Sequence, residues 1–342
     1  MIHFDSDYMA GALPEIINHL TKTNLEETVG YGFDDYTARA KNLICEACGD
    51  ENLQVHLLVG GTQTNKTVID TLLDRFEGVM AADTGHINVH ESGAIENSGH
   101  KVLALPSYEG KVKASDVEEY LKDFYADETY EHMVAPGALY ISFPTEYGTI
   151  YSLSELEQLS AVCHKWKKTL YIDGARLGYG LAAEGNDVTL ADIAKLADVF
   201  YIGGTKQGAL FGEAVVISKK SRFKSFTTIV KMHGALLAKG RLLGLQFETL
   251  FTDNLYMKAA EHAVRLAIKL RDGFAEKGFK PYINSPTNQQ FFKLPNETID
   301  NLAKIATFEY WGPRGETHSI VRFVCSWATK EESVDMLLKH LQ

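Results

Sequence analysis

An aspartate and a lysine follow two neighbouring predicted strands and could hold one ligand between them. Residues 169–172 and 198–202 are short apolar strands separated by an amphipathic helical stretch, which is typical of a right-handed βαβ unit. Asp173 directly follows the first strand, and Lys206 lies four residues beyond the second. Because parallel strands end at the same edge of a sheet, where open α/β folds bind ligands, we expect both side chains to face one site.

An amine and a carboxylate in this arrangement suit pyridoxal 5'-phosphate. A lysine amine forms a Schiff base with an aldehyde, and a nearby carboxylate stabilises a protonated ring nitrogen. Pyridoxal phosphate carries both the aldehyde and the ring nitrogen. Taken alone, the two residues are also compatible with an ordinary Asp-Gly turn and a solvated loop lysine. Other motifs of the chain are needed to distinguish a cofactor site from these structural roles.

A glycine turn between a buried strand and a helix is the third signal. Residues 55–59 form an apolar strand, Gly60, Gly61 and Thr62 follow at once, and a helix is predicted as far as Asp74. Free backbone N–H groups and the positive end of the helix dipole attract an anion at such a start. We expect the phosphate of the cofactor to bind there.

The same stretch nearly matches the P-loop of nucleotide hydrolases. Gly60 is followed after four residues by Asn65, Lys66 and Thr67, where the P-loop has Gly-Lys-Thr, and the strand before Asp173 could be a Walker B strand. A nucleotide hydrolase is therefore an alternative, which predicts Mg²⁺-dependent nucleotide binding that requires Lys66. A non-catalytic sheet scaffold that binds anions is another, and it predicts no cofactor absorbance.

Two histidines follow the next predicted strand, residues 79–82. His86, His90 and Glu91 could bind a metal if a helix brought them to one face, but the residues between the histidines alternate as in extended chain and no further ligand is evident. We therefore expect no metal site. A planar imidazole just past a strand end could instead lie flat on a cofactor ring, which is the role expected for His86.

Composition limits the classes of partner. The 342 residues are 45% hydrophobic and 23% charged, with a net charge of −11 and no Lys/Arg cluster, which argues against nucleic acid and anionic membranes as partners. The start has no signal-peptide pattern, and no stretch approaches the ~20 apolar residues of a membrane span, so we expect a cytoplasmic protein. The Cys45 and Cys48 pair lies in a helical pattern and is interpreted as structural thiols, like the apolar Cys163 and Cys325.

Strand and helix patterns predict an α/β protein of two domains and an arm. Residues 1–20 are interpreted as an N-terminal arm, residues 21–235 as a large α/β domain, and residues 236–342 as a smaller C-terminal α+β domain. The change of domain is placed in the helical stretch that begins at Gly234. Strand-like segments at 289–294 and 319–324 alternate with helices in the smaller domain.

Over nearly its whole length the chain resembles the threonine aldolase and β-eliminating lyase family of fold-type-I pyridoxal-phosphate enzymes. The matching motifs occur in the order of the family. They are the Asp-Ser-Asp of the arm (5–7), the tyrosine-glycine turn (30–32), Gly60-Gly61-Thr62 with Asn65, His86 five residues before Glu91, Ile172-Asp173-Gly174-Ala175-Arg176, Thr205-Lys206, and Arg322 in an apolar strand. The run from Ile172 to Arg176 is the most specific of these.

The resemblance implies an aspartate-aminotransferase-like fold with a mostly parallel seven-stranded sheet in the large domain. It implies that Lys206 binds pyridoxal phosphate, with Thr205 and Arg176 also near the cofactor. It implies that the carboxylate of a small amino-acid substrate is held by Arg322 together with Ser6 and Arg176. The expected reaction cleaves the Cα–Cβ bond of a β-hydroxy-α-amino acid such as threonine; β-elimination, racemisation and transamination are alternatives. A homodimer or homotetramer with shared active sites is expected.

Two departures from the family pattern stand out. Where threonine aldolases have a histidine that contacts the β-hydroxyl of the substrate, this chain has Glu146. A carboxylate whose pKa is raised by burial could accept the same proton, and His90 is a second candidate base. The family's Gly-Gly-Gly-Met-Arg-Gln run is replaced by residues 233–238, so Lys239 and Arg241 are the candidates for the missing phosphate-binding charge.

Overall fold

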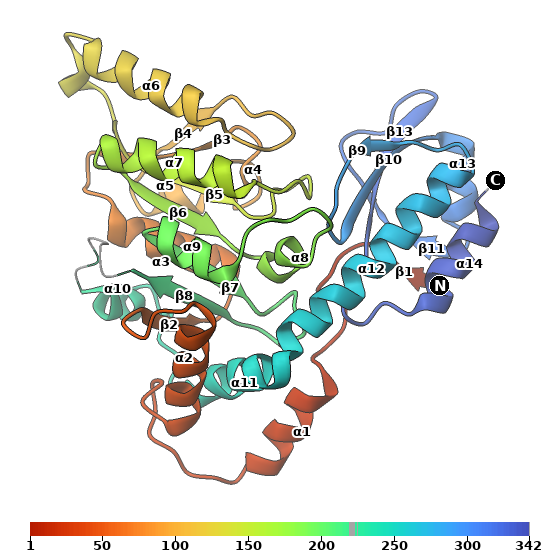
Figure 1. Cartoon of the computed structure of the whole chain (residues 1–342), viewed down its shortest axis with the longest axis horizontal. Coiled ribbons are helices and arrows are strands. Elements are labelled where there is room, and N and C mark those ends of the chain that lie inside the picture. The colour runs from red at the N-terminus through yellow and green to blue at the C-terminus, as the bar shows by residue number, and fades with distance from the viewer. Residues whose placement is uncertain (219–222, 224, 342) are drawn as a thin grey trace.

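The computed structural model shows a large unit built on one sheet and a smaller unit beside it, and it describes residues 1–218, 223 and 225–341 (Figure 1). The large sheet has seven strands, of which six run in one direction and β8 (Glu213–Ile217) runs antiparallel to both of its neighbours. In spatial order the strands are β2 (Gln54–Leu58), β8 (Glu213–Ile217), β7 (Val199–Gly203), β6 (Thr169–Asp173), β5 (Ala135–Ser142), β3 (Glu77–Ala82) and β4 (Val102–Leu105).

Helices cover both faces of this sheet, because successive residues of a strand point to opposite sides. In β5, Leu139 and Ile141 join one apolar cluster, whereas Ala138 and Tyr140 join the other. The first cluster includes side chains of α2 (Asp35–Ala47), α6 (Ala114–Ala126), α7 (Leu153–Lys165) and α9 (Leu190–Leu196). The second includes side chains of α3 (Gly61–Leu72), α4 (His86–Val89), α5 (Ala94–Asn97) and α10 (Phe226–Met232).

The predicted βαβ unit is present. β6 and β7 are parallel, and the connection between them contains α8 (Leu177–Leu181) and α9. α9 begins with a capping box in which Thr189 and Asp192 each bond the backbone N–H of the other, which explains why the helix starts there. A second capping box, formed by Ser152 and Glu155, starts α7.

The smaller unit packs one sheet against helices around its own core. Its sheet has the order β12 (Glu309–Tyr310), β13 (His318–Val324), β10 (Gln289–Pro295) and β9 (Pro281–Ile283). Phe274, Phe292 and Phe323 are buried in this core. The remaining elements of the unit are α13 (Asn296–Leu302), α14 (Glu331–His340) and the parallel pair β1 (Ile2–His3) and β11 (Ala306–Thr307).

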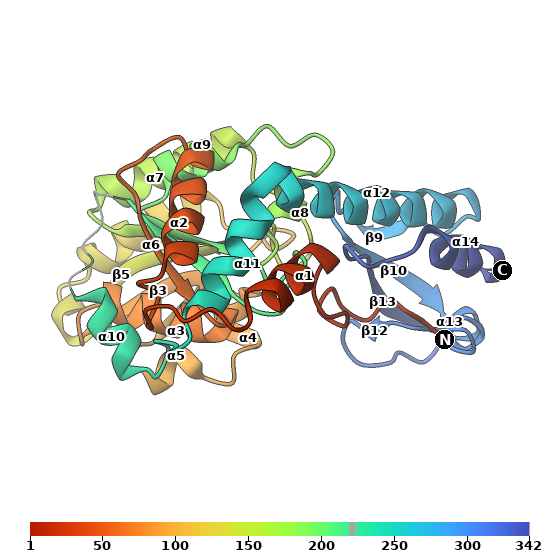
Figure 2. The same ribbon diagram turned by 90° about the horizontal axis from the view of Figure 1, so that it is seen from below.

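Helix α12 (Leu255–Glu276) connects the two units, and its ends lie in different ones (Figures 1 and 2). α11 (Arg241–Phe251) packs on α1 (Pro14–Thr23) and α2, which belong with the large unit. On this packing we propose that the domain boundary lies within α12, beyond the expected residue 236. The short 3-10 turns are η1 (Tyr130–His132) and η2 (Thr252–Asn254).

The N-terminal strand and the segment around His86 differ from what the sequence pattern indicates. Strand β1 pairs with β11, so the start of the arm lies in the small unit before the chain crosses to the large one (Figure 2). Residues 86–89 form a single helical turn, α4, rather than the extended chain that the alternating pattern indicated. A pattern of four residues is too short to separate the two periodicities. Among the helices of the described ranges, none is both long and apolar enough to span a bilayer.

Candidate active site

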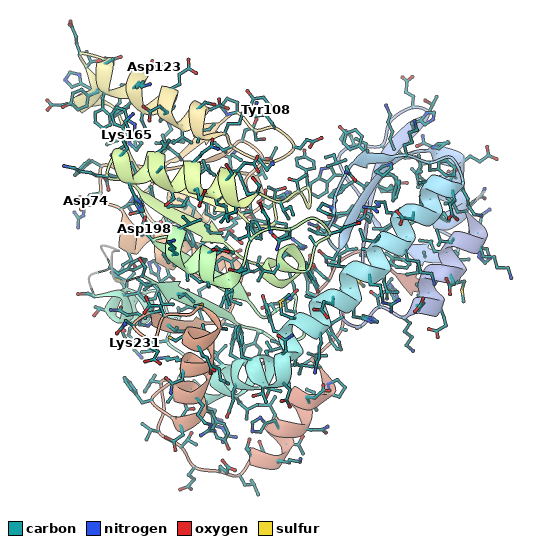
Figure 3. All side chains as sticks on the ribbon, viewed as in Figure 1. Asp74, Tyr108, Asp123, Lys165, Asp198 and Lys231 are labelled. Carbon is teal, nitrogen blue, oxygen red and sulfur yellow. The ribbon has the colours of Figure 1, made fainter. Side chains whose placement is uncertain are left out.

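One cavity lies at the carboxyl edge of the large sheet, beside the small unit. Side chains of both units fill the space between them, whereas charged residues such as Asp123 and Lys165 lie on the outer helices α6 and α7 (Figure 3). Of the expected residues, the cavity is lined by Gly61, Thr62, His86, Glu146, Asp173, Arg176 and Lys206. Gly60, Thr205, Ser6 and Arg322 lie outside this lining.

Asp173 is the last residue of β6, and its carboxylate is held by several donors. Tyr140 and Tyr201 each donate a hydroxyl hydrogen bond of 2.6 Å, one to each oxygen. The amide of Asn65 donates at 2.9 Å, and so does the backbone N–H of Ala175. These donors hold the carboxylate in one orientation and stabilise its negative charge at the cavity wall.

Glycine after Asp173 allows the two strand ends to approach closely. A Cβ at Gly174 would lie 1.9 Å from the carbonyl oxygen of Tyr201, a distance that no side chain can adopt. The backbone N–H of Gly203, the last residue of β7, donates to the carbonyl of Gly174 at 2.9 Å. Gly174 is therefore required by the close packing between the ends of β6 and β7, in addition to the turn that an Asp-Gly pair often forms.

Lys206 follows β7 and reaches the same cavity. Burial lowers the pKa of Lys206 to about 8, and the nearby Arg176 guanidinium acts in the same direction. The backbone of the lysine is held by Tyr179, whose hydroxyl donates to the Lys206 carbonyl at 2.5 Å. A lysine with a lowered pKa has a larger neutral fraction near neutral pH, and the neutral amine is the nucleophile.

The Thr205 hydroxyl is hydrogen-bonded to other residues of the protein and does not face the cavity. Its hydroxyl donates to Oε1 of Glu213 at 2.8 Å and accepts from the backbone N–H of Gly212 at 3.1 Å. Glu213 is the register partner of Gly203 across β7 and β8, and burial raises the pKa of Glu213 to about 8. The family resemblance implies that Thr205 lies near the cofactor, whereas no sequence pattern indicates Glu213, which the pairing of the antiparallel strand β8 brings beside Thr205.

The glycine turn delivers the start of helix α3 to the cavity. Gly60 is the N-cap and makes no side-chain capping bond, and Gly61 and Thr62 begin the helix. Lys66, which the P-loop interpretation requires at the phosphates, extends away and donates to the side chain of Asn97 at 2.8 Å. The geometry therefore fits an anion held by backbone groups and does not supply the P-loop lysine.

His86 is connected to Asp173 through two buried polar side chains. Nδ1 of His86 lies 2.7 Å from Oε1 of Glu91, and the Asn65 amide donates both to that oxygen and to Asp173. Tyr171 donates to Oδ1 of Asn65 at 2.7 Å, which fixes the orientation of the amide. His86 thus has an oriented ring facing the cavity, and its partner Glu91 explains the five-residue spacing.

Glu146 lies four residues beyond the end of β5 and lines the cavity beside Ser142. Its Oε1 accepts from the Ser142 hydroxyl at 2.6 Å and from the backbone N–H of His86 at 2.9 Å. Burial raises the pKa of Glu146 above its ordinary value. The second candidate base, His90, instead lines a neighbouring cavity with Tyr147 and Trp311.

Arg176 is already paired. Its Nε and Nη2 donate to the two oxygens of Asp7 at 2.7 and 3.0 Å, a bidentate pair between the large unit and the N-terminal arm. Asn288 donates to the same carboxylate at 2.9 Å. Burial by itself would raise the pKa of Asp7, but Arg176 and Lys206 hold it below the ordinary value. Asp7, rather than its neighbour Ser6, is the arm residue that contacts Arg176.

Arg322 projects from β13 in the small unit. Its Nη1 donates to Oε1 of Gln289 at 2.8 Å, and its Nη2 contacts Oε2 of Glu309. The guanidinium lies over the ring of Trp311, 5.1 Å from the centroid. Of the two candidates for the missing phosphate-binding charge, Arg241 donates to the carbonyl of Thr23 at 2.6 Å, and the Lys239 side chain is exposed.

Sequence reasoning missed most of the side chains that hold the site in place. Tyr140 and Tyr201 belong to the buried strands β5 and β7, and a tyrosine near the end of a buried strand needs a partner for its hydroxyl. Ser142 is the last residue of β5, as Asp173 is of β6, and could have been found by that strand-end signal. No sequence signal indicated Glu309, because its strand β12 has only two residues, too few for a recognisable alternation.

The chain is similar to known proteins over nearly its whole length. The family of the β-eliminating lyases matches residues 3–294. A low specificity L-threonine aldolase of Pseudomonas aeruginosa is 27% identical over 342 residues, covering 99% of this chain and 96% of that protein. The solved structure of a threonine aldolase of Leishmania major is 39% identical and superposes with a TM-score of 0.96, covering 100% of this chain and 98% of that one.

More distant structures share the fold alone. Aspartate aminotransferase of Thermus thermophilus superposes with a TM-score of 0.70 at 14% identity, over 99% of this chain and 90% of that one. The predicted aspartate-aminotransferase-like fold with its mostly parallel sheet is therefore confirmed. The family match covers the motifs at residues 60–65, 86–91, 172–176 and 205–206. This chain belongs to the β-eliminating lyase family.

Proposed function

We propose that the protein is a pyridoxal-phosphate-dependent lyase that cleaves the Cα–Cβ bond of a threonine-like β-hydroxy-α-amino acid to glycine and an aldehyde. The observation that supports this most directly is the shared cavity of Lys206 and Asp173, an amine with a lowered pKa opposite a fixed carboxylate. The family and the related threonine aldolases support the same activity.

The residues of the cavity fit the cofactor. The uncapped start of α3 at Gly61 and Thr62 suits a phosphate, and His86 offers an oriented ring for stacking. The fixed charge of Asp173 suits a protonated ring nitrogen, and Lys206 suits the aldehyde. When bound, pyridoxal phosphate supplies an electron-withdrawing ring that stabilises negative charge at the Cα of an amino acid.

The protein's own groups would then orient the substrate and move one proton. Arg322 would hold the substrate carboxylate in bidentate fashion, since a guanidinium matches a planar carboxylate. Glu146 would accept the proton of the β-hydroxyl, because its raised pKa makes it a better base than an exposed carboxylate. We place Arg176 in a supporting role, because Asp7 already occupies two of its N–H groups.

We also propose that active sites form in a homodimer or homotetramer. The support is an N-terminal stretch rich in exposed apolar side chains, which an aqueous surface would not favour as a group. The exposed members between residues 8 and 33 are Tyr8, Met9, Ile17, Leu25, Val29, Tyr31 and Phe33.

The test is the absorption of the purified protein after incubation with pyridoxal phosphate. A band near roughly 420 nm is expected, because a lysine bound to the cofactor aldehyde absorbs in this range. Borohydride should abolish the band and leave a modified peptide that contains Lys206. Glycine release from L-threonine and L-allo-threonine then tests the reaction itself.

Lys66 supplies the matched control lysine. Lys206→Ala should remove both the band and glycine release, whereas Lys66→Ala should retain both, since its side chain contacts Asn97 outside the cavity. Loss of activity in the Lys66 variant together with Mg²⁺-dependent nucleotide binding would instead support the nucleotide hydrolase. A protein that stays colourless, or one in which borohydride labels a lysine other than Lys206, would contradict the proposed cofactor site.

A further inference from the structure

We propose that Glu309 occupies the substrate-carboxylate position on Arg322 in the resting protein, and that an incoming carboxylate displaces it. This inference rests on the proposed function, in which Arg322 holds the substrate. It adds a residue that sets how tightly the carboxylate is bound.

Glu309 and Arg322 face each other because of strand pairing. They are register partners on the antiparallel strands β12 and β13, so their side chains leave the sheet on the same face. Oε2 of Glu309 contacts Nη2 of Arg322. The contact is therefore built into the backbone pairing of the small unit.

The hydrogen-bond pattern of Arg322 leaves one edge of the guanidinium incomplete. Nη1 is used by Gln289, and Nη2 by Glu309. Nε is buried and has no hydrogen-bond partner within the described part of the chain. A carboxylate that binds the Nε–Nη2 edge would make two parallel hydrogen bonds, whereas Glu309 reaches only one of these two nitrogens.

The exposures of the two side chains determine which one can leave. The Arg322 side chain is 9% exposed and stacks on Trp311, whereas the Glu309 side chain is 50% exposed. Releasing Glu309 into water has a small cost, as for surface ion pairs in general, but leaving Arg322 unpaired would leave a buried charge uncompensated. Replacing one carboxylate by another preserves the charge balance and gives Nε a partner.

The position of Glu309 also gives a route for the exchange. Glu309 lines the cavity beside the active site, together with His90, Tyr147 and Trp311. The ring centroids of His86 and His90 are 5.6 Å apart, so this neighbouring cavity lies close to the active-site histidine. A substrate that arrives through the neighbouring cavity would meet Glu309 before it reaches Arg322.

Competition by Glu309 has a defined kinetic consequence. A group that competes equally in the ground state and the transition state raises KM and leaves kcat unchanged. Glu309→Ala and Glu309→Gln in the holoenzyme should therefore lower the KM for L-threonine about two- to fivefold, the range expected for an exposed ion pair, with little change in kcat. Glu297→Gln, an exposed glutamate in the same unit, is the matched control and should change neither value.

Acetate isolates the carboxylate step, because it carries a carboxylate but no amine and cannot react with the cofactor. Acetate should inhibit the wild-type holoenzyme competitively and inhibit Glu309→Ala about two- to fivefold more tightly. Sodium chloride at matched ionic strength controls for screening of the ion pair. The Trp311 fluorescence, identified by its loss in Trp311→Phe, should respond to acetate in the wild type and not in Arg322→Ala.

The outcomes distinguish failure of the Glu309 displacement from failure of the proposed cleavage activity. An unchanged or higher KM, with unchanged acetate affinity in both Glu309 variants, would show that Glu309 orients Arg322 or is inert, and the inference would be overturned while cleavage activity stands. If the protein cleaves no β-hydroxy amino acid, the proposed function fails, yet tighter acetate binding detected by fluorescence would still support the displacement of Glu309.

Discussion

The two ends of the candidate site are built differently. The strand-tip end, formed by Asp173, Lys206 and the start of α3, lies within the large unit. The carboxylate end, formed by Arg322 and Glu309, lies on the sheet of the small unit. At the first end the carboxylate of Asp173 accepts bonds from Tyr140, Tyr201 and two further donors. At the second end a buried N–H has no partner in the described structure, and a half-exposed carboxylate supplies the counter-charge.

This difference suggests that the two ends bind different kinds of ligand. A group held for the lifetime of the protein benefits from a completed network, because preorganised dipoles need no rearrangement when the ligand binds. A group that enters and leaves in each turnover is better matched by a contact that can be exchanged at small cost. The strand-tip end therefore suits a resident cofactor, and the carboxylate end suits a substrate.

The largest expected effect comes from removing the charge at the strand-tip end while keeping its shape. Asp173→Asn should lower kcat about a hundred- to a thousandfold, the range for loss of one preorganised electrostatic group. Steady-state glycine release measures it. Asp123→Asn, an exposed residue of α6, is the control for one lost charge. If the Asp173 variant kept wild-type kcat, the contrast between a fixed and an exchangeable end would lose its basis.

The next largest effect concerns the proton acceptor. Glu146→Gln should lower kcat about a hundredfold with a smaller change in KM, because the amide can keep the bonds from Ser142 and His86 but cannot accept a proton. His90→Asn is the comparison, since His90 lines the neighbouring cavity. If kcat fell strongly in the His90 variant and not in the Glu146 variant, His90 rather than Glu146 would be the base.

At the carboxylate end, Arg322→Lys should act mainly on substrate binding. Lysine keeps the positive charge but cannot offer two parallel N–H bonds, so we expect KM to rise about tenfold with the cofactor absorption unchanged. Initial rates over a range of L-threonine concentrations give KM, and the absorption spectrum of the variant shows whether the cofactor is still bound. Loss of the absorption band would show that the two ends are not independent.

The pH dependence of cofactor binding gives the smallest and most specific test of the strand-tip end. Because burial lowers the pKa of Lys206 to about 8, its neutral fraction grows as the pH rises through this value. The rate at which cofactor-free protein combines with pyridoxal phosphate should rise about tenfold from pH 7 to pH 9 and then level off. A rate that keeps rising towards pH 10.5 would indicate a lysine with an ordinary pKa.

The main sheet and the principal site residues could be predicted because they depend on local order along the chain. Each strand of the large sheet has an apolar run of the right length, and the βαβ rule places Asp173 and Lys206 at one edge. The small helical turn at His86 was mispredicted, because four residues carry too little periodicity. Glu213 was missed, because its neighbourhood depends on β8, which enters the sheet antiparallel.

The sequence by itself determined which chemical groups meet at the ends of the parallel strands, since chain order and the handedness of βαβ connections leave little choice there. Only the tertiary structure decided how those groups are paired. Arg176 is bound by Asp7 of the arm, and Arg322 is covered by Glu309 of the neighbouring strand β12. Asp7 is brought to Arg176 by packing between distant segments, whereas Glu309 is brought to Arg322 by the pairing of two neighbouring strands. A buried charge must take the counter-charge that this arrangement provides.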